Sequence, residues 1–373
     1  MESHDGSDVS NNLEEDHKMR NLYRPATKKP FIAIAVSILV CLIACTPAFD
    51  QVEKVTFIAI ADPHFCMISK NVHMKIYERS SQIMEETIAE VNKMEDIDFV
   101  VLLGDLFRDL EVWNLDGMRE LLDDLSIPYY VIFGNHDVPP VRNKAVYGED
   151  IIMGYAACKA DFVMTFQGHG FNGHKYWWSA NPAHWVHLVG MDTTKIGTWG
   201  GHVSRHQLKW LQNILSAQAD KEVTIILAHH NLTTHGPDDE YPEWRKFRAD
   251  NAGEVRKILE SHSNVKLVIT GHHHIADIRT VNDIHYVTCP SILTYPCRYT
   301  KFTVTPRMAK IETIPVKNEE IIAEALAGIR MKDADKPPST VGQSDEKRAQ
   351  AQIDLALDIG GLLEDSSETL NFR

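Results

Sequence analysis

Five short polar clusters, each directly after an apolar run, carry side chains of the kinds that bind divalent metal ions. Carboxylate, amide and imidazole donors occur in them, and cysteine does not. Such donors suit Mn, Fe, Zn, Co or Ni better than they suit a thiolate-bound structural zinc. The clusters are Asp62-Pro63-His64, Gly104-Asp105, Gly134-Asn135-His136-Asp137, His229-His230 and Gly271-His272-His273-His274.

A pair of metal ions requires donors from several parts of the chain and one donor that both ions share, so that the ions lie about 3.5 to 4 Å apart. Aspartate is the natural shared donor because each of its two oxygens can bind one ion. We therefore expect Asp105 to bridge the ions and Asn135 to contribute a neutral amide oxygen. Each cluster alone is a weak signal, but all five in this order favour a two-metal hydrolytic centre over a structural origin.

The apolar runs before the clusters are short and rich in branched residues, which is typical of buried β-strands. Loops at the carboxyl ends of such strands are where α/β sheets bind ligands, so the clusters should meet in one crevice. Apolar residues at helical spacing separate the first three runs and predict a β-α-β-α-β order. The runs cover residues 55–61, 99–103, 129–133, 223–227 and 265–270.

The segments around these runs predict further elements. Residues 138–182 predict a long loop system beside the site, and Ser204 is the expected N-cap of a helix. Asn282-Asp283 predicts a hairpin turn, and a final strand over residues 302–314 is expected to complete the second sheet. The predicted division of the chain is a leader with a signal segment (1–45), a tether (46–53), a catalytic domain (54–316) and a helical or partly mobile C-terminal appendage (317–373).

The ordered clusters resemble those of the calcineurin-like metallophosphoesterase superfamily, and the match covers about residues 54–300. The resemblance implies an α/β fold, a four-layer α/β/β/α sandwich of two mixed sheets with a dinuclear metal site at one edge. It also implies how the ligands divide between the ions, with Asp105 shared by both. The first ion would be held by Asp62, His64, Asp105 and His274, and the second by Asp105, Asn135, His229 and His272.

The expected reaction follows from charge. Two cations would lower the pKa of a bridging water, and the resulting hydroxide would attack phosphorus in line. His136 is placed to protonate the leaving alkoxide or to stabilise the phosphate oxygens, and Asp137 to fix the tautomer of His136. Arg108 is expected to grip phosphate or to pair with Asp109, and His230 to support the ligands or contact the substrate.

Departures from two branches of the superfamily narrow the substrate. Purple acid phosphatases have a tyrosine ligand where this chain has Arg108, and protein Ser/Thr phosphatases have a glutamate where it has Asp137. The remaining pattern is similar to the class III cyclic-nucleotide phosphodiesterase branch. We therefore expect a metal-dependent hydrolase of small phosphoesters, with phosphodiesters such as cyclic nucleotides first. The alternatives are a phosphomonoesterase or nucleotidase on the same site, and a catalytically silent binding lipoprotein.

Charge excludes one class of partner. The net charge of −14 over 373 residues supplies no basic stripe for tracking a phosphate backbone, so no binding of nucleic-acid polymers is expected. A small anionic substrate fits better, because bound metal ions would supply the local positive charge. The oligomeric state and the identity of the ions are not readable from the sequence.

The N-terminal segment predicts export. An apolar run over residues 31–44 is shorter than the roughly 20 residues of a membrane span and fits a signal-peptide core. Cys45 ends a segment similar to a bacterial lipobox, so we expect it to be lipidated and to anchor an exported lipoprotein to the membrane; the alternative is an uncleaved N-terminal anchor. Translation can start at Met1 or at Met19.

Cys289 and Cys297 are either a disulfide or two buried thiols, and both readings stay open.

Overall fold

Two mixed β-sheets of six strands each form the centre of the computed structural model. The structure describes residues 53–72, 74–138, 156–234, 247–330 and 367–373, all of which belong to one unit, Val52–Arg373. The predicted signal segment, the lipidated Cys45 and the tether except for its last residue, Glu53, lie outside the described residues and stay predictions. Among the described helices, none combines the length and apolar character that a membrane crossing requires.

The first sheet holds three parallel strands on one side and three antiparallel strands on the other. The central strand β1 pairs in parallel with β2 and antiparallel with β10, so it joins the two halves. The spatial order is β12 (Ser367–Asn371), β11 (Met308–Pro315), β10 (Arg298–Thr305), β1 (Val55–Ile60), β2 (Phe99–Leu102) and β3 (Tyr129–Val131).

The second sheet has four parallel strands between two antiparallel edge strands. The predicted hairpin turn joins β8 to β9, and both Asn282 and Asp283 have the positive φ that a tight turn of this kind requires, at 51° and 62°. The spatial order is β4 (Trp178–Ala183), β5 (Val186–Gly190), β6 (Val223–Leu227), β7 (Val265–Thr270), β9 (Ile284–Thr288) and β8 (Asp277–Val281).

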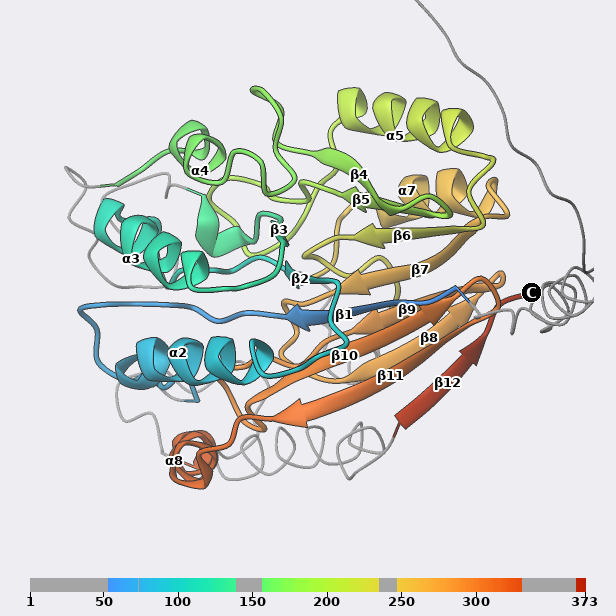
Figure 1. Cartoon of the computed structure of the whole chain (residues 1–373). Coiled ribbons are helices and arrows are strands. Elements are labelled where there is room, and N and C mark those ends of the chain that lie inside the picture. The colour runs from blue at the N-terminus through green and yellow to red at the C-terminus, as the bar shows by residue number, and fades with distance from the viewer. Residues whose placement is uncertain (1–52, 73, 139–155, 235–246, 331–366) are drawn as a thin grey trace, which may run out of the picture. The chain divides into compact units, whose positions relative to one another are not determined.

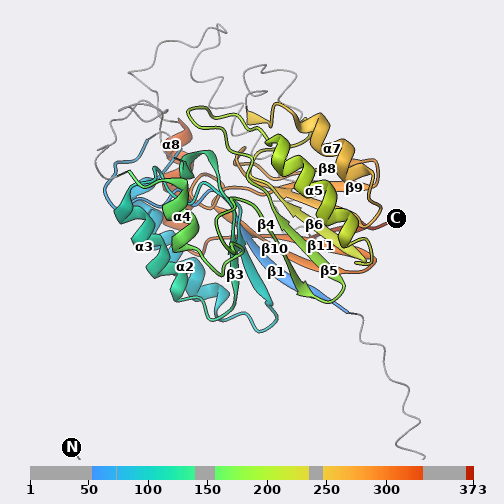
Figure 2. The ribbon, with the colours of Figure 1, turned by 90° about the horizontal axis from the view of Figure 1, so that it is seen from above.

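Helices cover the outer face of each sheet, which confirms the predicted α/β/β/α sandwich (Figures 1 and 2). On the first sheet these are α2 (Ser80–Val91) and α3 (Val112–Asp123), and on the second they are α5 (Arg205–Ala217) and α7 (Ala252–Glu260). Ser204 caps α5 as predicted, since its side chain accepts a hydrogen bond from the Gln207 amide. The shorter elements are η1 (Tyr77–Arg79), η2 (Asn135–Asp137) and α4 (Lys159–Thr165), and α8 (Glu319–Arg330) lies within the predicted C-terminal appendage.

Alternation along the buried strands explains the two layers of packing. On β6, Val223, Ile225 and Leu227 belong to the core that both sheets share, whereas Ile226 packs with the residues of α5 and α7. Successive side chains of a strand point to opposite faces, so a strand covered on both sides must be apolar at every position. The short, continuous apolar runs of the sequence are the result.

The metal-binding clusters follow the parallel strands only. Asp62 comes after β1, Asp105 after β2 and Asn135 after β3, while His229 follows β6 and His272 follows β7. The parallel strands of each sheet end at the same edge, and the two sheets face each other across the shared core. The fold therefore brings polar loops from both sheets to one place.

Three expectations about the elements need correction. The predicted strand over residues 302–314 is two strands, β10 and β11, which turn at Pro306-Arg307 and complete the first sheet rather than the second. Within the predicted loop system, residues 178–183 form the edge strand β4. The last residues of the expected helical or mobile appendage form β12, which pairs with β11. Cys289 and Cys297 are free, buried thiols in the structure.

We predict that β12 stabilises the domain through Leu370. This side chain is 7% exposed, belongs to the main core and lies opposite Ala309 of β11. Leu370→Ala should lower the free energy of unfolding by about 2 kcal/mol, because it leaves a cavity in a packed site. Urea unfolding followed by circular dichroism would measure the loss. The matched control is the exposed neighbour Thr369→Ala, for which we expect a change within about 0.5 kcal/mol; equal losses in both variants would contradict the role of Leu370.

Candidate metal centre

Two buried aspartates are held by backbone amides in a way that leaves carboxylate oxygen facing the site. The Oδ2 atom of Asp62 accepts a hydrogen bond from the His272 amide at 2.9 Å, and its buried Oδ1 atom has no hydrogen-bond partner in the described structure. The Oδ1 atom of Asp105 accepts a hydrogen bond from the His136 amide at 2.7 Å. Burying a carboxylate is costly unless its oxygens are paired, so an unpaired inner oxygen indicates a place for a cation.

Oxygen atoms behind two of the imidazoles fix which ring nitrogen faces inward. The Nδ1 atom of His229 lies 2.8 Å from the carbonyl oxygen of Leu103, and that of His274 lies 3.1 Å from the Thr294 hydroxyl. A nitrogen that donates its proton outward leaves the lone pair of Nε2 directed into the site, which is how metal-binding histidines are commonly oriented.

The first group of donors comes mainly from the first sheet. The Nε2 atoms of His64 and His274 lie 3.2 Å apart, and the Nε2 atom of His274 lies 3.4 Å from the Oδ1 atom of Asp62. The Oδ2 atom of Asp105 lies 3.8 Å from the Nε2 atom of His64. All four residues that the sequence assigns to the first ion are therefore together.

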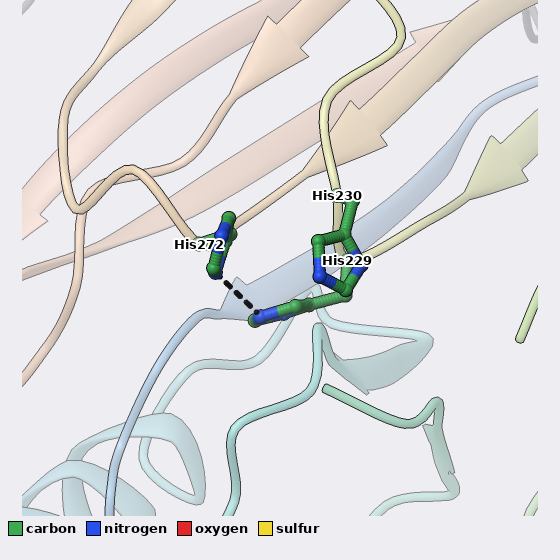
Figure 3. Close-up of side chains that lie close together, drawn as sticks. All are labelled: His229, His230 and His272. Carbon is green, nitrogen blue, oxygen red and sulfur yellow. Dashed lines mark hydrogen bonds between the residues drawn. The ribbon is translucent and has the colours of Figure 1, made fainter. Parts of the chain in front are cut away.

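The second group surrounds the Nε2 atom of His229. Its neighbours are the Oδ1 atom of Asn135 at 3.1 Å, the Nδ1 atom of His272 at 3.1 Å and the Oδ1 atom of Asp105 at 3.3 Å. Figure 3 shows His229 and His272 directed toward each other from the separate loops that follow β6 and β7. The two oxygens of Asp105 thus face different groups, as a shared ligand must.

The spacing within both groups fits metal ions. With metal–ligand distances near 2.1 Å, neighbouring ligand atoms of one ion lie about 3.0 to 3.4 Å apart. The donor pairs above lie between 3.1 and 3.4 Å within each group, except for the longer distance to Oδ2 of Asp105. Facing imidazole nitrogens need a proton or a cation between them, so the donors suit a dimetal site. Their individual roles as ligands stay predictions.

Backbone conformation marks the same residues. Five of them have a positive φ: Asp62 (50°), His64 (42°), Asp105 (50°), His272 (70°) and His274 (57°). Residues other than glycine rarely adopt this conformation, and such strain gathers at functional sites because the surrounding structure enforces it. Gly134 meets a different demand, since a Cβ there would lie 2.1 Å from the amide nitrogen of Asp105. A side chain at residue 134 would therefore displace the shared aspartate.

Without ions, the electrostatics of the site favour an anionic Asp105 beside a protonated His229, and neutral imidazoles at His64 and His272. Burial disfavours the charge of Asp105, but His229 and His136 outweigh it and hold the pKa of this carboxyl well below its usual range. Burial lowers the pKa of His229, but the nearby carboxylate of Asp105 outweighs burial and raises the pKa of this imidazole to about 9. Burial lowers the pKa of His64 and of His272 well below the ordinary value. Both rings are then neutral, which is the form that binds a metal.

His136 lies beside both groups and is 5% exposed. Its Nδ1 atom lies 2.5 Å from the carbonyl oxygen of Arg108, which fixes Nδ1 as the donor and leaves Nε2 as the acceptor. This contact corrects the expectation that Asp137 sets the tautomer. Asp137 is fully buried and accepts hydrogen bonds from the amides of Gly134 (2.7 Å) and Phe107 (3.2 Å), so it holds the loop that carries the ligands.

The two predicted substrate contacts have other partners in the structure. The Nε atom of Arg108 lies 3.7 Å from Asp109, and its guanidinium lies over the ring of Tyr77. Of the two roles expected for Arg108, the structure thus shows the pairing with Asp109, and a phosphate contact stays a prediction. His230 is fully buried, with Nδ1 2.8 Å from the Thr193 hydroxyl and Nε2 3.1 Å from the carbonyl oxygen of Trp199. This corrects the expected substrate contact, because both nitrogens of His230 position neighbouring segments.

Three residues near the site were missed by the sequence analysis. The ammonium of Lys75 lies 3.3 Å from the Nε2 atom of His136. The ring centroids of Phe247 and His272 lie 5.1 Å apart. Trp199, which is 41% exposed, stacks on Phe247 with the ring centroids 6.2 Å apart. None of the three belongs to a cluster after a strand, so no local pattern in the sequence places them here.

Comparison with known proteins settles the family. The family model described as calcineurin-like phosphoesterase matches residues 55–276, more than half of the chain. The chain belongs to the calcineurin-like phosphoesterase family. It is accordingly a metal-dependent phosphoester hydrolase, and its donors converge as such a centre requires.

Relatives of this phosphoesterase include cyclic-nucleotide enzymes. It is 25% identical over 232 residues to the 3',5'-cyclic adenosine monophosphate phosphodiesterase CpdA of Haemophilus influenzae, a match that covers 60% of this chain and 72% of the relative. It is 26% identical to a probable cyclic nucleotide phosphodiesterase of Psychrobacter arcticus, over 64% and 80% of the two chains. A dimetal phosphatase from Danio rerio shares the fold, with a TM-score of 0.54, 18% identity and coverage of 69% and 95%.

We predict that Asp105→Asn abolishes the binding of both ions by this phosphoesterase. The amide lacks the charge that two cations need to share, and loss of even a supporting residue costs about 10- to 100-fold in metal affinity. Inductively coupled plasma mass spectrometry of protein equilibrated with manganese would count the ions. The control is Asp96→Asn, an exposed aspartate paired with Lys54, which should bind like the wild type. Two ions retained by Asp105→Asn would contradict the bridging role.

Proposed function

We propose that this phosphoesterase hydrolyses small phosphodiesters, with cyclic nucleotides as the leading substrate class. The observation that carries the proposal is the pair of donor groups that share Asp105, with His136 lying beside them. The names of its relatives support the diester class. Two ions bound by the donors would activate a water molecule near neutral pH and neutralise the charge of the phosphate.

The chain's own groups would handle the leaving alkoxide. His136 has its Nδ1 proton committed to the Arg108 carbonyl, so Nε2 is the nitrogen that exchanges a proton with the substrate. Water adds across the phosphorus–oxygen bond, Nε2 takes up the proton that the attacking water loses, and the released alkoxide then takes this proton from Nε2, which leaves the imidazole neutral again. Because the ring is buried and its orientation is fixed by a backbone carbonyl, this nitrogen does not need to be aligned for each turnover.

The test compares three substrates, of which two are chromogenic and the third is cyclic AMP. Protein stripped with a chelator and reloaded with manganese should hydrolyse bis-p-nitrophenyl phosphate and cyclic AMP faster than p-nitrophenyl phosphate. His136→Ala should lower kcat for cyclic AMP, which has an alkoxide leaving group, by about 100-fold or more at unchanged metal content, since positioned acid–base groups contribute about 10²- to 10⁴-fold. Faster turnover of the monoester would point to a phosphomonoesterase or nucleotidase. Metal binding without turnover of any of these esters would point to a binding protein.

An aromatic pair beside the second donor group supports a nucleotide substrate. Phe247 lies edge-on to His272, and the exposed indole of Trp199 stacks on Phe247. The loop that carries Trp199 is fixed at two points, by the His230 contact to its carbonyl oxygen and by the Thr194–Gly201 bridge. A rigid aromatic face next to a phosphate site can stack a nucleobase.

We therefore predict that Trp199→Ala weakens the binding of adenosine 5'-monophosphate by about 10-fold, since base stacking is worth about 1–3 kcal/mol. Binding of inorganic phosphate, which has no base, should not change. Isothermal titration calorimetry on manganese-loaded protein would measure both ligands. Ile196→Ala removes another exposed apolar side chain from the same loop and serves as the control. An equal loss for both ligands would argue against stacking.

A further inference from the structure

Lys75 reaches the centre from a short segment between β1 and α2. Its amide and carbonyl both pair with those of Val72, at 2.9 and 3.0 Å, which fixes the backbone from which the side chain extends. The following residues Ile76 and Tyr77 are buried in the main core. The position of the Lys75 side chain is thus set by packed structure on its C-terminal side.

The ammonium of Lys75 is a basic group that lies against His136. Its Nζ atom lies 3.3 Å from the Nε2 atom of His136, the nitrogen directed away from the Arg108 carbonyl. Its charge interacts favourably with Asp105, Asp62 and Asp109, whereas burial opposes that charge and lowers the pKa of the lysine. Arg108, the cation that the sequence singled out, is turned toward Asp109 and Tyr77 instead.

Metal ions would change the partners of this ammonium. With ions bound, the charges of Asp62 and Asp105 are neutralised by the ions, and Lys75 then lies close to additional positive charge. A cation in that position is stabilised by an anion that binds between it and the ions. A phosphate held by the ions brings non-bridging oxygens to this side, and a lysine ammonium is a regular partner for phosphate.

We propose that Lys75 is a substrate-binding residue that holds a non-bridging phosphate oxygen beside His136. The inference rests on the proposed function, because it assigns a phosphate to the metal centre. Lys75 keeps the phosphate oriented so that the leaving oxygen faces Nε2 of His136. The contact is to the phosphate and not to the rest of the ester, so it applies to inorganic phosphate as well as to substrates.

The experiment uses manganese-loaded protein and inorganic phosphate as the probe. Lys75→Met removes the charge at similar side-chain length and should weaken phosphate binding about 10- to 100-fold, the usual effect of losing one charge-assisted hydrogen bond. Lys75→Arg keeps the charge and should bind within about threefold of the wild type. Lys70→Met removes a lysine of the same segment that is exposed and pairs with Glu78, and it should bind like the wild type. Metal content is measured in parallel and should be equal in all four proteins.

Each outcome decides the role of Lys75. Undiminished phosphate binding by Lys75→Met would overturn the inference, and so would loss of metal ions from that variant, because the lysine would then support the metal centre. Failure of Lys75→Arg to restore binding would also count against a charge contact. If wild-type protein hydrolyses no phosphoester but binds phosphate in a Lys75-dependent manner, the proposed function fails, and Lys75 is a phosphate-binding residue without a role in turnover.

Discussion

The carboxylate of Asp105 has to face two sets of donors at once, and most of the local structure serves this requirement. One oxygen lies 3.3 Å from His229 of the second sheet, and the other lies 3.8 Å from His64 of the first. The loops of two different sheets must therefore approach within a few ångströms of one side chain. The glycine at residue 134 and the positive φ angles of the donor residues are the means by which the backbone makes this approach.

The same arrangement is electrostatically costly without ions. Asp62 and Asp105 are almost fully buried, and imidazole nitrogens from different strands face one another. Backbone amides satisfy one oxygen of Asp62 and one of Asp105. The remaining oxygens and nitrogens gain their partners when cations bind, so folding supplies a rigid arrangement of donors and the ions supply the missing charge.

The features that a local sequence pattern determines were predicted from the sequence. Short apolar runs ending in Asp, Asn or His predicted the parallel strands and the convergence of the donors, because strand direction alone determines where such residues gather. The sheet predicted for the final strands was wrong. Packing determines which strands pair, and the apolar periodicity of a sequence does not show that pairing. The group that fixes the tautomer of His136 was also predicted wrongly. It is the backbone carbonyl of Arg108, and because every residue has such a carbonyl, the sequence does not show which one a side chain contacts. Lys75 and Phe247 reach the site through loop conformations, which no short motif encodes.

The position of β1 has a consequence for the order of events during synthesis. This first strand lies between β2 and β10, and β10 begins only at Arg298. The loop of Asp62 therefore leaves the ribosome more than 230 residues before β10, the strand that pairs with β1 on this side, begins to be made. One edge of β1 stays unpaired until then, and ions cannot be captured by the complete donor set until His274 has been made.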